Sequence, residues 1–163
     1  MVNITPDLAA KRDIVRNVID LARSLGIGLP KIALLSAVED VNPAIPATVD
    51  AAELCKMADR GQIEGAILDG PLGFDNAISA DAARVKGIVS PVAGAPDVLV
   101  VPALESGNIL YKALVRLGGA DCAGIILGTR VPIVLTSRAD SRDCRVASCA
   151  LAVVHAVAAA RGH

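Results

Sequence analysis

The strongest constraint on the fold is an alternation between short aliphatic runs and longer segments with helical spacing. Aliphatic runs of strand length lie in residues 31–38, 65–69, 97–102, 123–127 and 131–135. Apolar residues recur at helical spacing in residues 7–25, 49–62, 77–86 and 105–117, and again after Asp140 or Ser141. Unbroken aliphatic strands are typical of parallel sheets that are buried on both faces. The alternation predicts an α/β fold with three αβα layers, a mostly parallel sheet and right-handed crossovers.

Local signals mark the ends of some of these elements. Thr5 is predicted to cap the first helix, Pro6 to open it and Gly26 to close it. The second aliphatic run is predicted to end in a turn at Gly70-Pro71. No repeat or low-complexity linker divides the sequence.

The composition fits such a fold and excludes some classes of function. Hydrophobic residues make up 53% of the 163 residues but aromatic residues only 1%, so aliphatic side chains must build the core. A chain of this length can bury one good core. The shortage of aromatic rings argues against base stacking, and a net charge of −1 gives no basic surface for a phosphate backbone. We therefore expect no nucleic-acid partner.

Cysteine and histidine are too few and too scattered for a metal site. The 4 cysteines form no C-x-x-C pair, and only His155 and His163 could complete a ligand set. We interpret the cysteines as small hydrophobic residues and expect a cytoplasmic chain with reduced thiols, because no leader-like segment opens the sequence. Residues 146–160 are too few and too polar for a membrane span, so a buried helix and no membrane partner are predicted.

Three polar loops follow predicted strands, which is where open α/β sheets bind ligands. They lie at residues 69–76, around residues 105–108 and at residues 136–143. The third loop opens a helix, whose N-terminal amides attract anions. Arg130, Arg138 and Arg142 add forked donors that suit phosphate or carboxylate groups. The pattern thus predicts an anion-binding loop near Ser137.

The same residues also have structural interpretations. Asp140 and Asp143 suit a helix N-cap and first turn, and Ser137 could satisfy the end of a strand. The arginines could be solvated charges, and Asn76 and Asn108 could serve turns or caps. The G-x-x-x-x-G-K-[ST], strand-linked G-x-G-x-x-G and G-x-S-x-G patterns are absent, so motifs alone lead no further.

Longer runs of the sequence resemble one known family. They are Ser36-Ala37-Val38-Glu39, Val41-Asn42-Pro43, Asp50-Ala51-Ala52, Leu54-Cys55-Lys56-Met57-Ala58-Asp59-Arg60-Gly61-Gln62, Asp69-Gly70-Pro71-Leu72, Phe74-Asp75-Asn76-Ala77-Ile78-Ser79, Gly87-Ile88-Val89-Ser90-Pro91-Val92-Ala93-Gly94 and Pro132-Ile133-Val134-Leu135-Thr136-Ser137-Arg138-Ala139-Asp140-Ser141. These runs are similar to the phosphate acetyltransferase and phosphate butyryltransferase family, and the resemblance covers residues 2 to about 151. It is nearest to the branch whose members are often fused behind a small acyl-CoA hydratase-like domain.

The resemblance implies a fold, a reaction and a division of the chain. The family's fold is similar to that of isocitrate and isopropylmalate dehydrogenases, in which two α/β domains enclose a cleft. Its members transfer an acetyl or butyryl group reversibly between coenzyme A and inorganic phosphate. The implied partners are acyl-CoA, acyl phosphate and phosphate, with no tightly bound cofactor and no metal. Residues 1–136 would form the second domain, and residues 137–163 the catalytic loop and a carboxyl-terminal helix that returns to the first.

The resemblance also implies roles for residues. Ser137 and Arg138 match the family's pair at the phosphate and acyl site, where Arg138 would neutralise charge and Ser137 would donate to the carbonyl oxygen. Asp140 is the candidate base for the coenzyme A thiol, with Asp143 as its substitute. The further candidate substrate-binding residues are Asn76, Asn108, Arg130 and Arg142.

Family members carry an amino-terminal segment that supplies further binding residues, and this sequence begins like the middle of such a protein. We therefore expect a truncated form with little transferase activity alone. The alternative is a non-catalytic fragment that dimerises or that binds a ligand in a regulatory role. A homodimer is expected through the apolar helix 146–160, because exposed apolar surface favours self-association.

Overall fold

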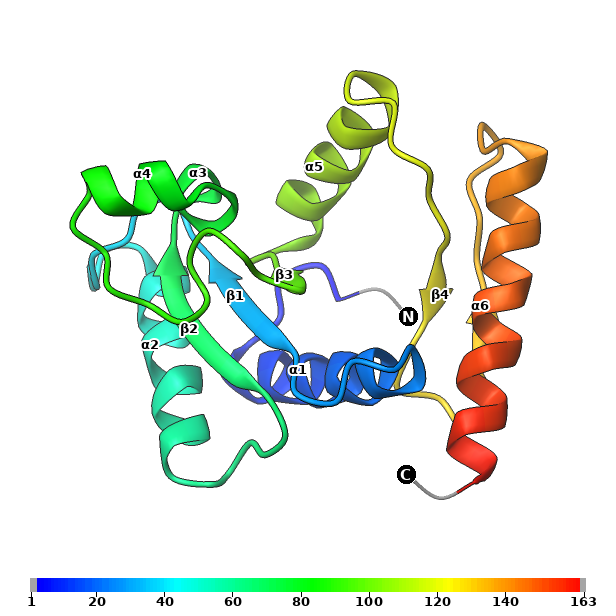
Figure 1. Cartoon of the computed structure of the whole chain (residues 1–163), viewed down its shortest axis with the longest axis horizontal. Helices are drawn as coiled ribbons and strands as arrows, with labels where there is room; N and C mark the ends of the chain where they lie inside the picture. The colour runs from blue at the N-terminus through cyan, green and yellow to red at the C-terminus, as the bar shows by residue number, and fades with distance from the viewer. Residues whose placement is uncertain (1–2, 162–163) are drawn as a thin grey trace.

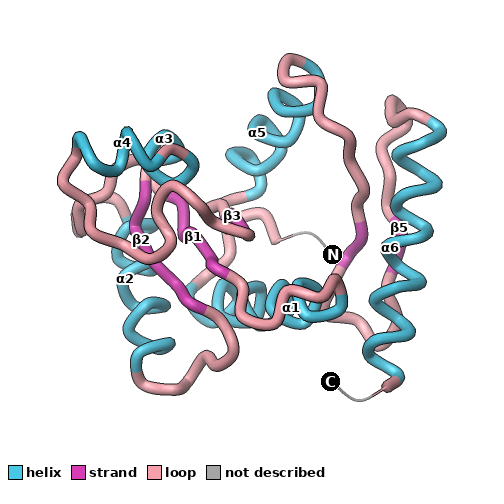
Figure 2. The backbone as a smooth tube through the Cα atoms, in the orientation of Figure 1, coloured by secondary structure: helices cyan, strands magenta, loops and turns pink. Residues whose placement is uncertain are grey.

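The computed structural model describes residues 3–161 as helices and strands in alternation (Figure 1). The helices are α1 (Leu8–Ser24), α2 (Pro46–Asp59), α3 (Phe74–Ile78), α4 (Ala80–Val85), α5 (Leu104–Arg116) and α6 (Arg142–Ala160). The strands are β1 (Lys31–Leu35), β2 (Ile67–Leu72), β3 (Val98–Val100), β4 (Ile125–Ile126) and β5 (Ile133–Val134). Each predicted strand region overlaps one observed strand, and long loops flank the last two strands (Figure 2).

The main sheet has three parallel strands in the order β2-β1-β3. Its register places Ala33 between Asp69 and Leu99. Each step from one strand to the next along the chain passes through helices, as parallel strands require. The α/β class and the parallel sheet are thus confirmed for these strands.

Two hydrophobic cores lie on opposite faces of this sheet. One joins α1 and α2 to the sheet through buried residues such as Val15, Ile32 and Leu54. The other joins α3 and the loop around Val92 to Ala33, and Leu110 of α5 packs against it. Because helices cover both faces, this part of the molecule has the three predicted layers.

The last two strands depart from the prediction of one sheet. β4 and β5 form a separate antiparallel pair, with Ile125 opposite Val134 and Ile126 opposite Ile133. The reason is the connection, because only residues 127–132 join the two strands. A parallel crossover needs a dozen or more residues, whereas a short loop joins antiparallel neighbours.

The predicted turn at Gly70-Pro71 is also wrong, because β2 continues through both residues to Leu72. β2 is an edge strand, where a proline is tolerated because one side of the backbone needs no partner. Gly70 is required by close packing, since a Cβ there would lie 2.7 Å from the carbonyl oxygen and the Cβ of Leu34.

Two helix boundaries differ from their sequence signals. The N-cap of α1 is Asp7, whose carboxylate accepts a 2.8 Å hydrogen bond from the Ala10 amide, so Thr5 lies outside the helix. The single helix predicted for residues 77–86 is divided into α3 and α4. Ser79 separates them because its side chain accepts from the Ala82 amide and caps the second helix.

The second half of the chain has few buried side chains. α5 contains no buried residue, and the predicted buried helix at residues 146–160 is largely exposed. Val146 and Val153 of α6 are 60% and 62% exposed. By length and composition alone, α6 is long and apolar enough to cross a membrane. Within the chain, 22% of an 18-residue stretch of this helix is buried. The prediction of a buried helix is wrong for this chain, because of the described residues of α6 only Cys144, Ser148, Ala152 and Ala158 are buried, against α1, the β4–β5 pair and the loop before β4.

Candidate functional site

The loop before α6 is closed on itself by hydrogen bonds between Ser137 and Asp140. The Ser137 amide donates to Asp140 Oδ2 at 2.6 Å, and the Asp140 amide donates to the Ser137 carbonyl at 3.1 Å. Ser137 Oγ accepts from the Ala139 amide at 3.3 Å. Because this contact uses an acceptor position of the hydroxyl, the proton of Ser137 stays available to donate to a ligand oxygen.

Ser141 and not Asp140 caps α6. Its Oγ accepts from the Cys144 amide at 3.1 Å. Asp143 lies in the first turn, where a negative charge is favourable beside the positive end of the helix. Asp140 is therefore a loop-closing residue, while the first-turn interpretation of Asp143 is confirmed.

The two candidate carboxylates differ in the number of hydrogen bonds that they accept. Asp140 Oδ2 accepts from the Ser137 amide, and its Oδ1 accepts from the Tyr111 hydroxyl at 3.4 Å. Asp143 is exposed, and its carboxylate has no hydrogen-bond partner among residues 3–161. Both oxygens of Asp140 thus already accept a hydrogen bond, whereas those of Asp143 are open to a ligand.

Both carboxylates line one hollow between α5 and α6, with a volume of about 490 Å³. Its other lining residues include Arg116, Asp121, Cys122 and Cys144. Ser137 and Arg138 do not line it, although both belong to the adjoining loop. The hollow thus brings Asp140 and Asp143 together beside one arginine.

Sequence reasoning missed Arg116 and Tyr111 of α5. The Arg116 Nη2 atom donates to the Ala139 carbonyl at 3.1 Å, and the Tyr111 hydroxyl reaches Asp140. Both contacts join residues more than twenty positions apart, so no local spacing could reveal them. The one available signal was that Tyr111 is the single tyrosine of the chain.

Two thiols lie against the same loop. Cys122 Sγ and Cys144 Sγ are 3.1 Å apart, and the Tyr111 hydroxyl lies 3.2 Å from Cys122 Sγ. The contact with Cys122, followed by burial, raises the pKa of Cys144 to about 11, and the same partner raises the pKa of Tyr111. A thiol with such a pKa stays protonated at neutral pH, so Cys144 is not an activated nucleophile.

Arg138 presents its guanidinium to solvent. Its side chain is exposed, and among the described residues it is used only through its backbone carbonyl, to which Arg145 Nη2 donates at 3.5 Å. Arg142 is likewise exposed, at the first position of α6. A free guanidinium beside a helix N-terminus can bind a phosphate group with two parallel hydrogen bonds.

The remaining candidates lie apart from this loop. Arg130 lines a different hollow of about 310 Å³ near the end of α6, beside His155. Asn108 lines a third hollow, of about 420 Å³, between α5 and β4. Both asparagine candidates lie inside helices, so their interpretation as turn or cap residues is wrong. The chain alone therefore does not gather the predicted residues into one site.

Asn76 is fully buried near the carboxyl end of β2. Its Nδ2 lies 3.4 Å from Glu39 Oε2, while its Oδ1 and Ser36 Oγ have no partner among the described residues. Lys86 Nζ bridges Glu39 Oε2 at 3.1 Å and Asp75 Oδ2 at 3.3 Å. A buried acceptor without a donor requires a water or a ligand group. Asn76 therefore stays a candidate substrate-binding residue, although its side chain is not exposed to solvent.

His155 links α6 to α1. Its Nδ1 lies 2.9 Å from Ser24 Oγ, which also donates to the Asp20 carbonyl. The histidine is therefore satisfied at a helix interface. Within residues 3–161 no group of three or more His, Cys, Asp or Glu side chains could hold a metal ion.

Comparison with known proteins places this loop in context. The family model described as phosphate acetyl/butaryl transferase matches residues 1–153. The phosphate acetyltransferase of Rhizobium meliloti is 63% identical over 155 residues, which are 95% of this chain and 49% of that protein. The phosphate butyryltransferase of Clostridium acetobutylicum is 47% identical, over 93% of this chain and 50% of that protein. The chain thus spans about half the length of the curated relatives it matches.

A solved structure agrees with these similarities. The branched-chain phosphotransacylase from Enterococcus faecalis V583 matches with a TM-score of 0.86 and 42% identity, over 94% of this chain and 55% of that chain. Sequence and fold therefore agree over almost all of the described residues. The chain belongs to the phosphate acetyl/butyryltransferase family.

Proposed function

We propose that this chain provides the acid-base and anion-binding half of a phosphate acyltransferase. The reaction is the reversible conversion of acyl phosphate and coenzyme A into acyl-CoA and inorganic phosphate, with an acetyl or a butyryl group. The observation that carries the proposal is the loop 136–143. It combines an exposed arginine, a serine whose hydroxyl can still donate a hydrogen bond, and the N-terminus of a helix. Relatives named for acetyl and for butyryl transfer both support the coarse reaction.

In this proposal Arg138 and Ser137 stabilise charge. The Arg138 guanidinium holds the phosphate and the negative charge that grows on the carbonyl oxygen. The Ser137 hydroxyl donates to that oxygen, since its acceptor contact with Ala139 leaves the proton free. Removing one such donor typically lowers turnover by about 100- to 1000-fold.

A carboxylate removes the proton of the coenzyme A thiol. The thiolate then attacks the acyl carbon, a C–S bond forms, and phosphate leaves with the electron pair of the broken C–O bond. We assign the base to Asp143, because Asp140 already accepts hydrogen bonds from Ser137 and Tyr111. A free thiol of pKa about 8.5 is mostly protonated at neutral pH, so a positioned base accelerates the attack.

We propose that the isolated chain transfers acyl groups slowly or not at all. The chain covers about half of its curated relatives, and the candidates Asn108, Asp140, Asp143 and Arg130 are divided among three hollows. The R. meliloti relative offers a test, because this chain can replace its matched 155 residues. We expect the hybrid to form acetyl-CoA from acetyl phosphate, and the isolated chain to show less than about one hundredth of that rate.

Variants of the hybrid test the roles. Asp143→Asn is expected to reduce turnover more than Asp140→Asn, with a larger loss at lower pH, where less thiolate forms unaided. Arg84→Ala serves as the control, because Arg84 lies on α4 and is exposed in a pair with Asp81. Full activity of both aspartate variants would refute the assigned base, and an inactive hybrid would refute the proposed reaction.

A second function class rests on α6. Its valines are exposed, so this face offers an apolar surface for a second copy, and we propose a homodimer. Light scattering of the purified chain measures its mass, and Val153→Asp is expected to convert a dimer into monomers. A titration with coenzyme A then separates a ligand-binding fragment from an inert one. A monomer at all concentrations would contradict the dimer.

A further inference from the structure

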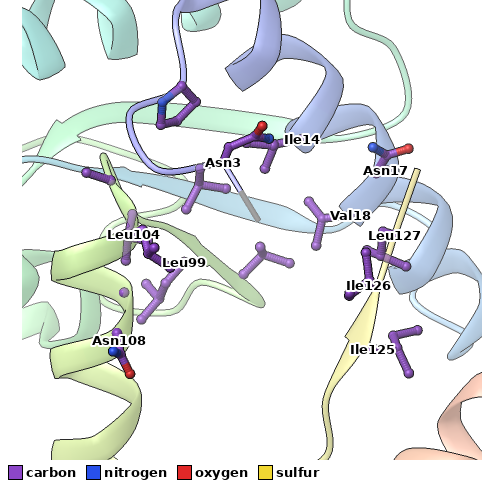
Figure 3. A pocket seen from close by; sticks show the side chains of 16 residues that line it. Asn3, Ile14, Asn17, Val18, Leu99, Leu104, Asn108, Ile125, Ile126 and Leu127 are labelled. Atoms are coloured by element: carbon purple, nitrogen blue, oxygen red, sulfur yellow. The ribbon is translucent and has the colours of Figure 1, made fainter. Parts of the chain in front are cut away.

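Two hollows of the molecule differ in the chemistry of the side chains that line them. The hollow of about 420 Å³ in Figure 3 is lined mainly by aliphatic side chains such as Leu99 and Ile126, and its described lining contains no cysteine. The hollow of about 490 Å³ between α5 and α6 is lined by Cys122 and Cys144. Of these two hollows, the second therefore offers groups that can be oxidised and reduced.

The two thiols of this hollow are held in contact by the backbone around them. Cys122 Sγ and Cys144 Sγ are 3.1 Å apart, although 22 positions separate the two residues in the sequence. The Gly124 amide donates to Ser148 Oγ at 2.9 Å, and Ser148 Oγ donates to the Cys144 carbonyl at 2.7 Å. Ser148 thus ties the segment after Cys122 to the turn of α6 that carries Cys144. Both thiols are free, and a bond between them requires their sulfur atoms to approach by about 1 Å.

The other two cysteines have no thiol partner. Cys55 Sγ donates to the Gly70 carbonyl at 3.6 Å, and burial raises the pKa of this thiol to about 12. Cys149 is exposed on α6. Within residues 3–161, Cys122 and Cys144 are the one pair of cysteines whose sulfur atoms are in contact. The other two thiols are therefore internal controls for any reaction of this pair.

The two thiols differ in their access to an oxidant. Cys122 is half-buried, whereas Cys144 is 6% exposed. The contact with Cys122, followed by burial, raises the pKa of Cys144 to about 11, so this thiol stays protonated. The Tyr111 hydroxyl donates to Cys122 Sγ at 3.2 Å, which stabilises a thiolate at that sulfur. A small oxidant that enters the hollow therefore reacts first with Cys122.

We propose that Cys122 and Cys144 are a redox pair that a low-molecular-mass disulfide converts into a disulfide bond. The Cys122 thiolate attacks one sulfur of the small disulfide, whose S–S bond breaks as a mixed disulfide forms, and the first small thiol leaves with the Cys122 proton. The Cys144 sulfur then attacks the Cys122 sulfur, and the second small thiol leaves with the Cys144 proton. The two protein thiols are oxidised, and the small disulfide is reduced to two thiols.

The charges in the hollow make this exchange slow but do not prevent it. Asp121, Asp140 and Asp143 line the hollow beside Arg116, so three carboxylates face one guanidinium and disfavour a thiolate. We therefore expect the exchange to take hours. Its second step joins two sulfur atoms that are already in contact, so it competes well with the return of the small thiol. The pair stays reduced where thiols prevail and closes where disulfides accumulate.

The bond would also act on the loop 136–143, and this consequence rests on the proposed function. Cys144 directly follows Asp143, which lies in the first turn of α6. The Tyr111 hydroxyl contacts both Cys122 Sγ, at 3.2 Å, and Asp140 Oδ1, at 3.4 Å. Bringing the sulfur atoms together by about 1 Å therefore shifts the supports of both candidate carboxylates. A misplacement of about 1 Å can cost about 100-fold in rate, so we expect oxidation to lower turnover at least about tenfold.

Peptide mapping of the whole chain tests the bond without an assay of turnover. The chain is equilibrated with oxidised glutathione, its remaining thiols are alkylated, and its tryptic peptides are identified by mass spectrometry. Trypsin cleaves after Arg130 and Arg145. Because these sites separate Cys122, Cys144 and Cys149, each of the three falls in its own peptide. We expect the peptides of Cys122 and Cys144 to be linked and to separate with dithiothreitol, while Cys149 carries glutathione.

The R. meliloti hybrid measures the effect of the bond on turnover. Acetyl-CoA formation is compared before oxidation, after oxidation and after dithiothreitol, in assays of minutes that leave a slowly exchanging bond intact. We expect at least a tenfold loss on oxidation and recovery with dithiothreitol. Cys122→Ser is expected to keep the reduced rate and to lose the response to oxidation. The matched control Cys149→Ser changes an exposed thiol of α6 and is expected to keep both the rate and the response.

Two results would overturn the proposal. The first is glutathione bound to Cys122 with no linked peptides, which would show that the two sulfur atoms do not meet. The second is an intact Cys122–Cys144 bond with unchanged turnover, because the bond would then not act on the loop. A reduced hybrid without turnover would refute the proposed function instead, and the linked peptides would still decide whether the redox pair exists.

Discussion

Residues 8–100 build two cores from their apolar side chains, whereas residues 101–160 leave most of theirs exposed. Ile32 and Leu54 are 0% and 1% exposed, while Ile109 and Leu117 are 71% and 89% exposed. Among the described residues after Val100, the buried hydrophobic ones are Cys144, Ala152 and Ala158. Both regions are aliphatic, so composition does not explain the difference. The first region supplies its own partners, and the second presents surfaces that another polypeptide could cover.

The largest effect is expected when equal truncations are made in the two regions. Ile32→Ala removes a fully buried side chain from the core between β1, α1 and α2, and should cost about 2–5 kcal/mol of unfolding free energy. Leu117→Ala removes an 89% exposed side chain and should change it by less than about 0.5 kcal/mol. Urea denaturation measures both. Equal losses would show that the second region is as well packed as the first.

The next effect concerns catalysis in the second region. Arg138→Ala in the R. meliloti hybrid is expected to reduce acetyl-CoA formation by about 100- to 1000-fold, because it removes the guanidinium proposed to bind phosphate. The control Arg84→Ala, in the first region, should keep the parent rate, since its side chain is exposed and paired only with Asp81. A comparable loss in both variants would contradict a specific role for Arg138.

A smaller effect is expected when the polar contact that attaches α6 to the rest of the second region is removed. Ser148 is 0% exposed, its Oγ accepts from the Gly124 amide at 2.9 Å, and it donates to the Cys144 carbonyl at 2.7 Å. Ser148→Ala leaves that amide unpaired and should cost about 1–3 kcal/mol. The exposed neighbour gives the control variant Cys149→Ala, which should cost little. Thermal unfolding followed by circular dichroism compares them.

The smallest effect concerns acid stability in the first region. The Asn76 amide, followed by Lys86, holds the pKa of Asp75 below its usual 3.8. A depressed folded pKa contributes stability that is present above pH 3.8 and is lost as the pH falls through the folded value. Asp75→Asn should therefore lower Tm slightly at pH 6 and lose less Tm than the parent between pH 5 and pH 3. An identical acid response of both proteins would exclude this contribution.

The first region was predictable because its sequence pattern reports its burial. β3 and, after Lys31, β1 are unbroken aliphatic runs, as is typical of strands covered on both faces, whereas β2 contains Asp69, Gly70 and Pro71 between its aliphatic ends. The antiparallel β4–β5 pair was mispredicted because the short connection between the strands was not weighed against their aliphatic pattern. The end of β2 was mispredicted because a glycine and a proline suggest a turn wherever an edge strand cannot be recognised.

The candidate site was predictable in its loop but not in its contacts. Ser141 and Asp143 follow from capping preferences that act within four residues. The contacts of Tyr111 and Arg116 with the loop join distant segments, so no sequence period reports them. The exposure of α6 was missed because an apolar helix looks the same whether its partner belongs to the same chain or to another polypeptide.

Acyl transfer by the chain with and without its complement is the most direct test of the central claim, that this chain forms one part of an active site. The measurement is acetyl-CoA formation from acetyl phosphate, first with the isolated chain and then with the chain co-expressed with the unmatched part of the R. meliloti relative. We expect negligible turnover alone and turnover in the complex that Arg138→Ala abolishes. Equal turnover with and without the complement, or a complex that forms but stays inert, would contradict the claim.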